Sequence, residues 1–123
     1  LGNLQGKCSS TNALDIIFMV DSSGSVYDDE YNNWQSELDL VNEIVQSLPE
    51  EKTRTSLINF SGCGSSFTLE QCQAQGRLDV VFGLDGYGAP NDLELVSTRI
   101  DSMTSDDFNG GYTWTNEALG LAL

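Results

Sequence analysis

A short apolar run near the start of the chain ends abruptly at a run of small polar residues. Residues 14–20 read Leu-Asp-Ile-Ile-Phe-Met-Val, and residues 21–25 read Asp-Ser-Ser-Gly-Ser. A nearly continuous run of β-branched and aromatic residues is typical of a strand that is covered on both faces. Small polar residues with a glycine favour a tight loop. We therefore expect a buried strand whose carboxyl end opens into a polar loop.

Strand-like and amphipathic segments alternate after this loop. Apolar residues recur at three- and four-residue steps up to Leu48, which predicts a helix of about five turns that ends at Pro49. The expected elements, in chain order, are this helix from about residue 28, strands over 53–60 and 78–82, a helix capped by Asn91 or Asp92, and a last helix from about Thr115. The glycine-rich segment 61–77 between the last two strands is expected to be an ordered loop.

This order of elements indicates an α/β fold. Buried strands that alternate with amphipathic helices predict a doubly wound, mostly parallel central sheet flanked by helices. The 123 residues suffice for one domain, in which residues 1–13 are a polar lead-in and residues 14–123 are folded. Because the sequence stops in the apolar run Leu-Gly-Leu-Ala-Leu, we expect it to be the N-terminal two-thirds of a larger domain, with the C-terminal part missing.

The charge and the residue types exclude several classes of function. The chain has 19 acidic and 5 basic residues, and its net charge of −14 argues against nucleic acid and anionic lipid as partners. Histidine is absent, which excludes Ser-His and Cys-His nucleophile pairs and His-ligated zinc within these residues. No apolar run approaches the roughly 20 residues that span a bilayer. We therefore expect no membrane insertion within this segment and no enzyme activity.

Three side chains of the polar loop are candidate ligands of a cation. In an open α/β sheet, ligands bind outside the carboxyl ends of the strands. Asp21, Ser23 and Ser25 offer one carboxylate and two hydroxyls at alternate positions, and Gly24 permits a tight turn between them. These hard oxygen donors suit Mg²⁺. The alternative is an ordinary Ser/Gly-rich turn in which the aspartate bonds only to nearby amides.

A second pattern, Gly-Gly-Tyr-Thr-Trp-Thr-Asn-Glu-Ala-Leu at 110–119, precedes the last expected helix. Together with Asp-Ser-Ser-Gly-Ser it strongly resembles the von Willebrand factor type A domain, the integrin I-like domain. Members of that family begin with an apolar strand ending in Asp-x-Ser-x-Ser and later carry Gly-Gly-x-Thr-x-Thr-x-x-Ala-Leu. The resemblance covers essentially the whole chain.

The resemblance implies a metal-ion-dependent adhesion site. Its metal ligands would be Asp21, Ser23, Ser25 and Thr113, with Thr115 as a helix cap, and the last acidic ligand would follow Leu123. The cofactor would be Mg²⁺, or Mn²⁺ or Ca²⁺. The implied function is extracellular adhesion, in which the cation binds an Asp or Glu of a partner protein. The alternative is a structural unit of an extracellular filament, matrix or cell-surface glycoprotein, whose partners are neighbouring subunits.

The three cysteines suggest an oxidising compartment. Cys63 and Cys72 are close enough in sequence for a local disulfide that closes a small loop, whereas Cys8 is left over. The alternative is three reduced, buried thiols. The resemblance implies that Cys8 pairs with a cysteine beyond Leu123. It also identifies 61–77 as a cysteine-containing insertion, which we expect near one edge of the sheet.

Three further residues are candidates for function. Trp114 and Tyr112 flank Thr113 and are candidate partner-binding residues on the rim of the site, although packing beside the loop is the alternative for Trp114. Asn59 begins the only glycosylation sequon, Asn-Phe-Ser, which would make the protein a glycoprotein. Its place at the end of an expected strand argues against modification.

Overall fold

The computed structural model describes residues 13–26, 33–87, 92–104 and 107–123. Residues 1–12 of the expected lead-in, which include Cys8, and the start of the first helix near residue 28 lie outside these residues. The strands expected over 53–60 and 78–82 have these bounds in the structure. The elements are β1 (Leu14–Asp21), α1 (Asn33–Ser47), the 3₁₀ helix η1 (Glu50–Lys52), β2 (Thr53–Phe60), α2 (Leu69–Ala74), β3 (Leu78–Phe82), α3 (Leu93–Asp101) and α4 (Thr115–Ala122).

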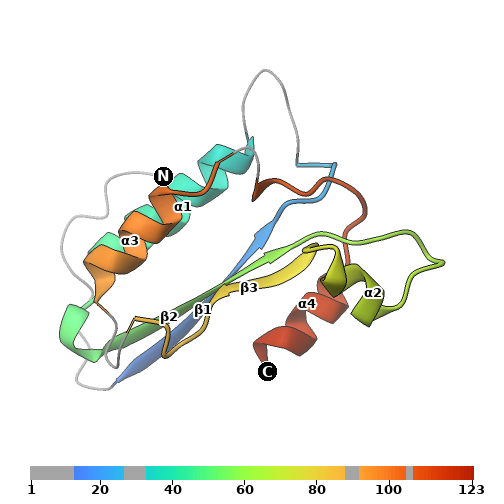
Figure 1. Ribbon diagram of the computed structural model, residues 1–123. Helices are drawn as coiled ribbons and strands as arrows, with labels where there is room; N and C mark the ends of the chain where they lie inside the picture. Colours follow the sequence, from blue (N-terminus) through green and yellow to red (C-terminus); the bar gives the residue numbers. More distant parts are fainter. Residues whose placement is uncertain (1–12, 27–32, 88–91, 105–106) are drawn as a thin grey trace.

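The strands form one mixed sheet in the order β1-β2-β3 (Figure 1). β1 and β2 are parallel and in register from Leu14 opposite Thr53 to Asp21 opposite Phe60. β3 is antiparallel to β2, because the chain between them carries only the short helix α2 at the end of the strands. A parallel return requires a crossover of a dozen or more residues that passes back along the sheet.

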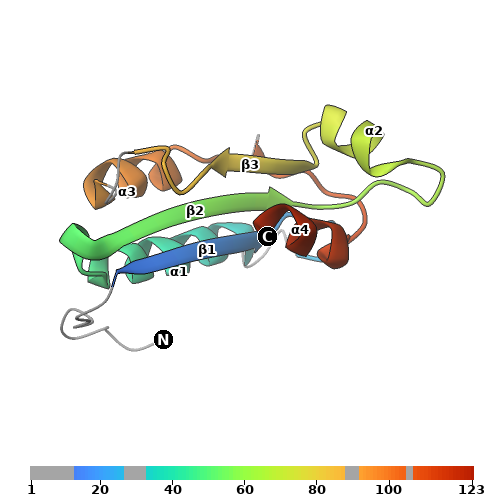
Figure 2. The same cartoon turned by 90° about the horizontal axis from the view of Figure 1, so that it is seen from below.

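Helices cover both faces of the sheet, as the expected α/β fold requires. α1 and α3 lie together on one face, and α4 lies on the other (Figures 1 and 2). Neighbouring residues of a strand point to opposite faces, so Leu57 packs with α1 and α3 whereas Ile58 packs with α4.

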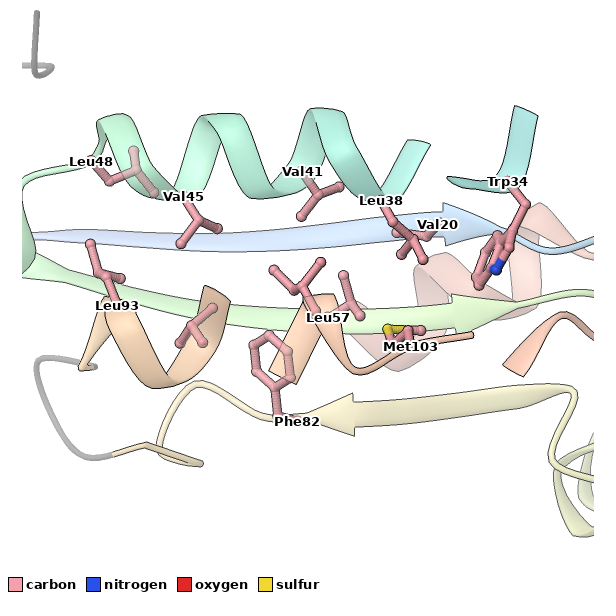
Figure 3. Close-up of a cluster of buried hydrophobic side chains, with 12 residues drawn as sticks. Val20, Trp34, Leu38, Val41, Val45, Leu48, Leu57, Phe82, Leu93 and Met103 are labelled. Carbon is pink, nitrogen blue, oxygen red and sulfur yellow. The ribbon is translucent and has the colours of Figure 1, made fainter. Parts of the chain in front are cut away.

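The larger hydrophobic core lies between the sheet and the pair α1 and α3 (Figure 3). Helix α1 supplies its apolar stripe at three- and four-residue steps, which is the pattern that predicted the helix. Leu57 of the central strand is fully buried against this stripe. The buried members of the cluster are Val20, Trp34, Leu38, Val41, Val45, Leu48, Leu57, Phe82, Leu93, Val96, Ile100 and Met103.

The expectation of a loop over 61–77 is wrong in one part, because this segment contains helix α2. Thr68 and Gln71 form a capping box at its start: the Thr68 hydroxyl accepts from the Gln71 N–H at 3.2 Å, and the Thr68 N–H donates to the Gln71 side chain at 2.9 Å. These two bonds satisfy free backbone and side-chain groups at the helix start. Within the described residues, no helix is long and apolar enough to cross a membrane.

Asp92, one of the two predicted caps, is the N-cap of α3. Its carboxylate accepts from the N–H groups of Glu94 at 3.1 Å and Leu95 at 3.3 Å. Replacing Asp92 with alanine should lower the free energy of unfolding by about 1 kcal/mol, because two N–H groups at the helix start lose their acceptor. Urea unfolding measures this change. The exposed Asp79 of β3 is the matched control, and an equal loss for Asp79→Ala would contradict a capping effect.

Candidate functional site

The polar loop after β1 folds back on its own aspartate. A carboxylate oxygen of Asp21 accepts the Ser23 N–H at 2.8 Å, which is the local turn that a short acidic side chain favours. This turn places the Ser23 and Ser25 hydroxyl oxygens 3.0 Å apart. Ser23 is fully buried, whereas Ser25 is exposed. The loop therefore holds one buried and one exposed hydroxyl side by side at the carboxyl end of β1.

Thr113 reaches the same point from the other end of the chain. Its hydroxyl donates to the Ser23 hydroxyl oxygen at 2.8 Å, across 90 positions of sequence. Two backbone bonds hold the two loops together: Gly24 N–H donates to Gly111 O at 2.9 Å, and Gly110 N–H donates to Ser22 O at 2.8 Å. The structure thus brings Ser23, Ser25 and Thr113 together, beside Asp21.

Two glycines allow this close approach. Gly110 and Gly111 have φ values of 63° and 88°, a region that other residues rarely adopt. A Cβ atom on Gly111 would also lie 2.5 Å from Nη1 of Arg77 and 2.7 Å from the carbonyl oxygen of Gly62. The Gly-Gly pair therefore has a backbone role at the place where three loops meet.

The donor set fits a hard divalent cation. In octahedral coordination at about 2.1 Å, neighbouring oxygen ligands lie about 3.0 Å apart. The separations from Ser23 Oγ to the Ser25 and Thr113 hydroxyl oxygens, 3.0 and 2.8 Å, match that spacing. The described residues contain no group of three His, Cys, Asp or Glu side chains that could hold a metal. The candidate donor set therefore differs from such a group, because it has three hydroxyls and one carboxylate.

A second carboxyl group lies near Asp21. Burial raises the pKa of Glu37 on α1 above its ordinary value. A hydrogen bond with the Asp21 backbone opposes this shift, and the Asp21 charge adds to it. The neighbourhood of the hydroxyl cluster is therefore acidic, which favours a cation and disfavours an anion.

Tyr112 and Trp114 differ in their surroundings. Tyr112 is 65% exposed on the rim beside Thr113. Trp114 is half-buried and packs against the smaller core on the α4 face, with its indole directly over Gly62. Trp114 thus packs beside the loop, and a partner-binding role for Tyr112 and Trp114 stays a prediction. The cap expected at Thr115 was wrong: Thr115 begins α4, and Trp114 occupies the cap position without a side-chain cap.

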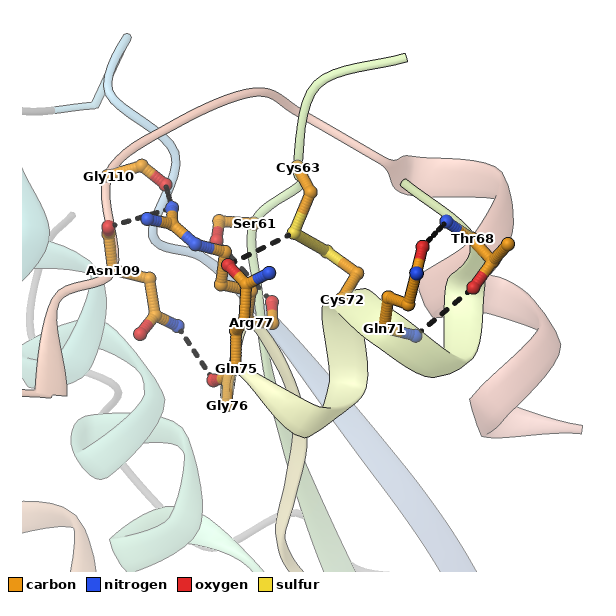
Figure 4. Close-up of a disulfide and its surroundings, with 10 residues drawn as sticks. All are labelled: Ser61, Cys63, Thr68, Gln71, Cys72, Gln75, Gly76, Arg77, Asn109 and Gly110. Carbon is orange, nitrogen blue, oxygen red and sulfur yellow. Dashed lines mark hydrogen bonds between the residues drawn. A yellow bond between two sulfur atoms is a disulfide. The ribbon is translucent and has the colours of Figure 1, made fainter. Parts of the chain in front are cut away.

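A disulfide joins Cys63 and Cys72 and closes the segment between β2 and β3 (Figure 4). Both cysteines are buried in the smaller core. Cys72 belongs to α2, so the bond fixes this helix beside the end of β2. The segment lies next to β3, an edge strand of the described sheet.

The sequon asparagine is not presented to solvent. Asn59 lies in β2, is 5% exposed, and donates its amide to the carbonyl oxygen of Asp107 at 2.8 Å. A folded domain in this arrangement offers no free amide nitrogen at Asn59, in line with the expectation from its place in the strand.

Arg77 is a residue of this region that the sequence did not single out. Its Nη1 donates to the carbonyl oxygens of Asn109 at 3.1 Å and Gly110 at 2.9 Å, at the start of the Gly-Gly turn (Figure 4). Arg77 thereby ties the disulfide-closed segment to the loop that carries Thr113. Its only signal in the sequence is an arginine between a glycine and a strand in a very acidic chain.

A family model described as the von Willebrand factor type A domain matches residues 15–123. The chain belongs to this family. The resemblance inferred from the two motifs is therefore confirmed.

The relatives are much larger proteins, and this chain matches only a part of each. The chain is 30% identical over 116 residues to the human collagen alpha-6(VI) chain, covering 94% of this chain and 4% of that protein. It also resembles the solved structure of proximal thread matrix protein 1 from the mussel byssus, with 23% identity and a TM-score of 0.65. That match covers 92% of this chain and 24% of the byssus protein. A further structure of the byssus protein is described as having zinc in its MIDAS motif, the metal-ion-dependent adhesion site. It matches with 22% identity and a TM-score of 0.66.

Proposed function

We propose that this von Willebrand factor type A domain is an extracellular protein-binding module that depends on a divalent cation. Asp21, Ser23, Ser25 and Thr113 would hold the cation. When bound, the cation supplies a coordination position for an Asp or Glu side chain of a partner protein. The observation that carries this proposal is the approach of the Thr113 and Ser25 hydroxyls to Ser23, all within 3.0 Å of that one oxygen.

The charge of the chain gives the cation a further role. A partner carboxylate approaching a domain of net charge −14 is repelled at long range. A divalent ion beside Asp21 reverses the local sign at the point of contact. The proposal is one of binding without catalysis, and the absence of histidine from the chain agrees with it. The byssus protein, a member of the same fold with zinc at its MIDAS motif, supports a cation at this position.

The identity of the relatives supports a second candidate. A collagen chain and a thread matrix protein are both components of assemblies by name, and this chain matches only a small part of each. The domain would then be a structural unit of an extracellular assembly, which contacts neighbouring subunits without recruiting a ligand through a cation. Both candidates place the protein outside the cell, in agreement with the disulfide.

Removing two hydroxyls tests the cation site. In the full-length protein, the double substitution Ser23→Ala and Ser25→Ala should weaken Mg²⁺ and Mn²⁺ binding at least tenfold, because two of the four proposed ligands are lost. Titration calorimetry measures the affinity, and far-ultraviolet circular dichroism checks the fold. Serines 65 and 66, exposed on a turn, provide the matched double control. Equal affinity in the wild type and the Ser23/Ser25 variant would overturn the assignment.

A binding experiment separates the two candidates. Partners retained on the immobilised protein in Mg²⁺ and released by EDTA support recruitment through the cation. Partners retained equally in both buffers, and equally by the Ser23/Ser25 double variant, support the structural unit instead.

A further inference from the structure

A cavity of about 220 Å³ lies beside the candidate cation site. The disulfide-closed segment forms one wall, with Cys63 and Phe67, and the Gly-Gly loop forms another, with Gly111 and Tyr112. Arg77 also lines the cavity. Tyr112 directly precedes Thr113, so the cavity and the hydroxyl cluster share one loop.

Arg77 gives this cavity a positive charge without a negative partner. Nη1 donates to two neutral carbonyl oxygens, those of Asn109 and Gly110. Within the described part of the chain no carboxylate lies in ion-pair contact with Arg77, whereas Arg54 pairs with both Asp15 and Asp85. A guanidinium has five N–H donors in a fixed fork, which binds a carboxylate best. Within the described residues, no hydrogen bond is found for the Nε and Nη2 donors of Arg77, whereas Nη1 donates to these two carbonyls.

Two exposed aromatic rings complete the cavity. Phe67 is 42% exposed and Tyr112 is 65% exposed, one on each wall. Large apolar side chains left in water beside a charged group are typical of an interaction surface, because the rings gain contact area when a partner covers them. The apolar walls also lower the local dielectric around the guanidinium once the cavity is filled, which strengthens an ion pair formed there.

We propose that this cavity is a second contact for the partner that binds at the cation. The occupant is an acidic segment of another protein: one carboxylate reaches the cation, and a second, with an apolar neighbour, reaches Arg77 between Phe67 and Tyr112. Arg77 contacts Gly110, three residues before Thr113, and three residues of chain span at most about 11 Å. We therefore expect the two carboxylates to lie within about four residues of each other in the peptide. This inference rests on the proposed function, since it assigns the first carboxylate to the cation.

Selection from a random peptide display library on the full-length protein in Mn²⁺ tests this inference. We expect enriched peptides with two acidic residues at that spacing and an aromatic or aliphatic residue beside the second. A synthetic peptide of the enriched sequence should bind about tenfold more weakly when its second acidic residue is replaced by the amide. Arg77→Gln should cause a similar loss with the original peptide and little further loss with the amide peptide.

Two matched comparisons separate the cavity from the loop that Arg77 supports. Phe67→Ala, which leaves every Arg77 hydrogen bond in place, should weaken the original peptide about three- to fivefold, whereas the half-exposed Leu95 of α3 provides a control, Leu95→Ala, with unchanged binding. The Mn²⁺ affinity of Phe67→Ala should equal that of the wild type within about threefold. Arg77→Gln also removes two hydrogen bonds to the loop that carries Thr113, so its peptide binding is compared with that of the wild type at saturating Mn²⁺.

Each outcome has a separate meaning. A selection without enriched sequences, enriched peptides with a single acidic residue, or a loss with Arg77→Gln that is equal for the acidic and amide peptides would overturn the second contact. Binding that survives EDTA but depends on Arg77 and the second carboxylate would overturn the proposed cation-dependent function while it supports the cavity. Loss of binding in EDTA with no effect of Arg77→Gln or Phe67→Ala would do the reverse.

Discussion

Replacing Gly62 with alanine should lower the free energy of unfolding by about 2–3 kcal/mol and weaken cation binding as well. A Cβ atom at this position would enter the Trp114 ring: it would lie 2.6 Å from Cγ and 2.9 Å from Nε1, and closer still to Cδ1. Relief of this overlap requires a shift of Gly62, which is buried, or of Trp114, which is half-buried and packs against the smaller core. Overpacking of this kind typically costs 1–3 kcal/mol.

The effect of Gly62→Ala on the site follows from the chain connection. Gly62 O accepts the Tyr112 N–H at 3.1 Å, and Thr113 lies between Tyr112 and Trp114. A displaced indole therefore shifts the Thr113 hydroxyl away from Ser23. We expect thermal unfolding and Mn²⁺ titration to show both losses.

Nearby glycines provide controls for this prediction. A Cβ on Gly64 would meet only a Tyr112 ring atom at 3.8 Å, an ordinary contact, and one on Gly83 would meet nothing within 4 Å. Gly64→Ala and Gly83→Ala should therefore leave the Mn²⁺ affinity unchanged. Adding Trp114→Leu to Gly62→Ala should restore part of the stability, since a smaller side chain relieves the overlap. If Gly62→Ala were as stable as Gly64→Ala, the close packing of Trp114 on Gly62 would be refuted.

The substitution Leu57→Ala should cause the larger loss of stability, about 3–4 kcal/mol. Leu57 lies in the central strand, is fully buried, and packs among α1, α3 and the neighbouring strands. Truncation removes apolar contacts and leaves a cavity that helices on a rigid sheet close only in part. Urea unfolding at constant pH measures the change. We expect the side chains of Phe82 and Val45, which belong to the same cluster, to keep their positions if the helices stay in place.

Leu95 is the matched control for this substitution. It belongs to α3, is 50% exposed, and undergoes the same chemical change in Leu95→Ala. Because little area is buried, the loss should stay within about 0.5 kcal/mol. Comparable losses at Leu57 and Leu95 would contradict the placement of the core between the sheet and the helix pair.

The sequence predicts most elements that carry a clear period. Residues 53–60 and 78–82 form strands with the expected bounds, because their apolar and β-branched content fits a buried sheet. The direction of β3 is not contained in its own residues. It depends on the path of the chain from β2, where the short helix α2 does not carry the chain back along the sheet.

Some signals were present but local. The Thr68-x-x-Gln71 spacing is that of a capping box and marks the start of α2, although the glycines around it favour a loop. Other features join residues far apart and have no local signal. The contact of Trp114 with Gly62 and the bonds from Arg77 to Asn109 and Gly110 exist only once three loops have met.

Two backbone hydrogen bonds join Ser22 and Gly24 to the Gly-Gly turn. The candidate site therefore connects the loop after β1 to the loop that leads into α4. The proposed cation would bind only the folded arrangement of these two loops. Its binding would therefore stabilise the native state by mass action. At a free concentration one hundred times its dissociation constant, the gain is about 2.7 kcal/mol for the whole domain. Occupancy of this one site would thus raise the thermal stability of the whole domain, including α1, α3 and α4.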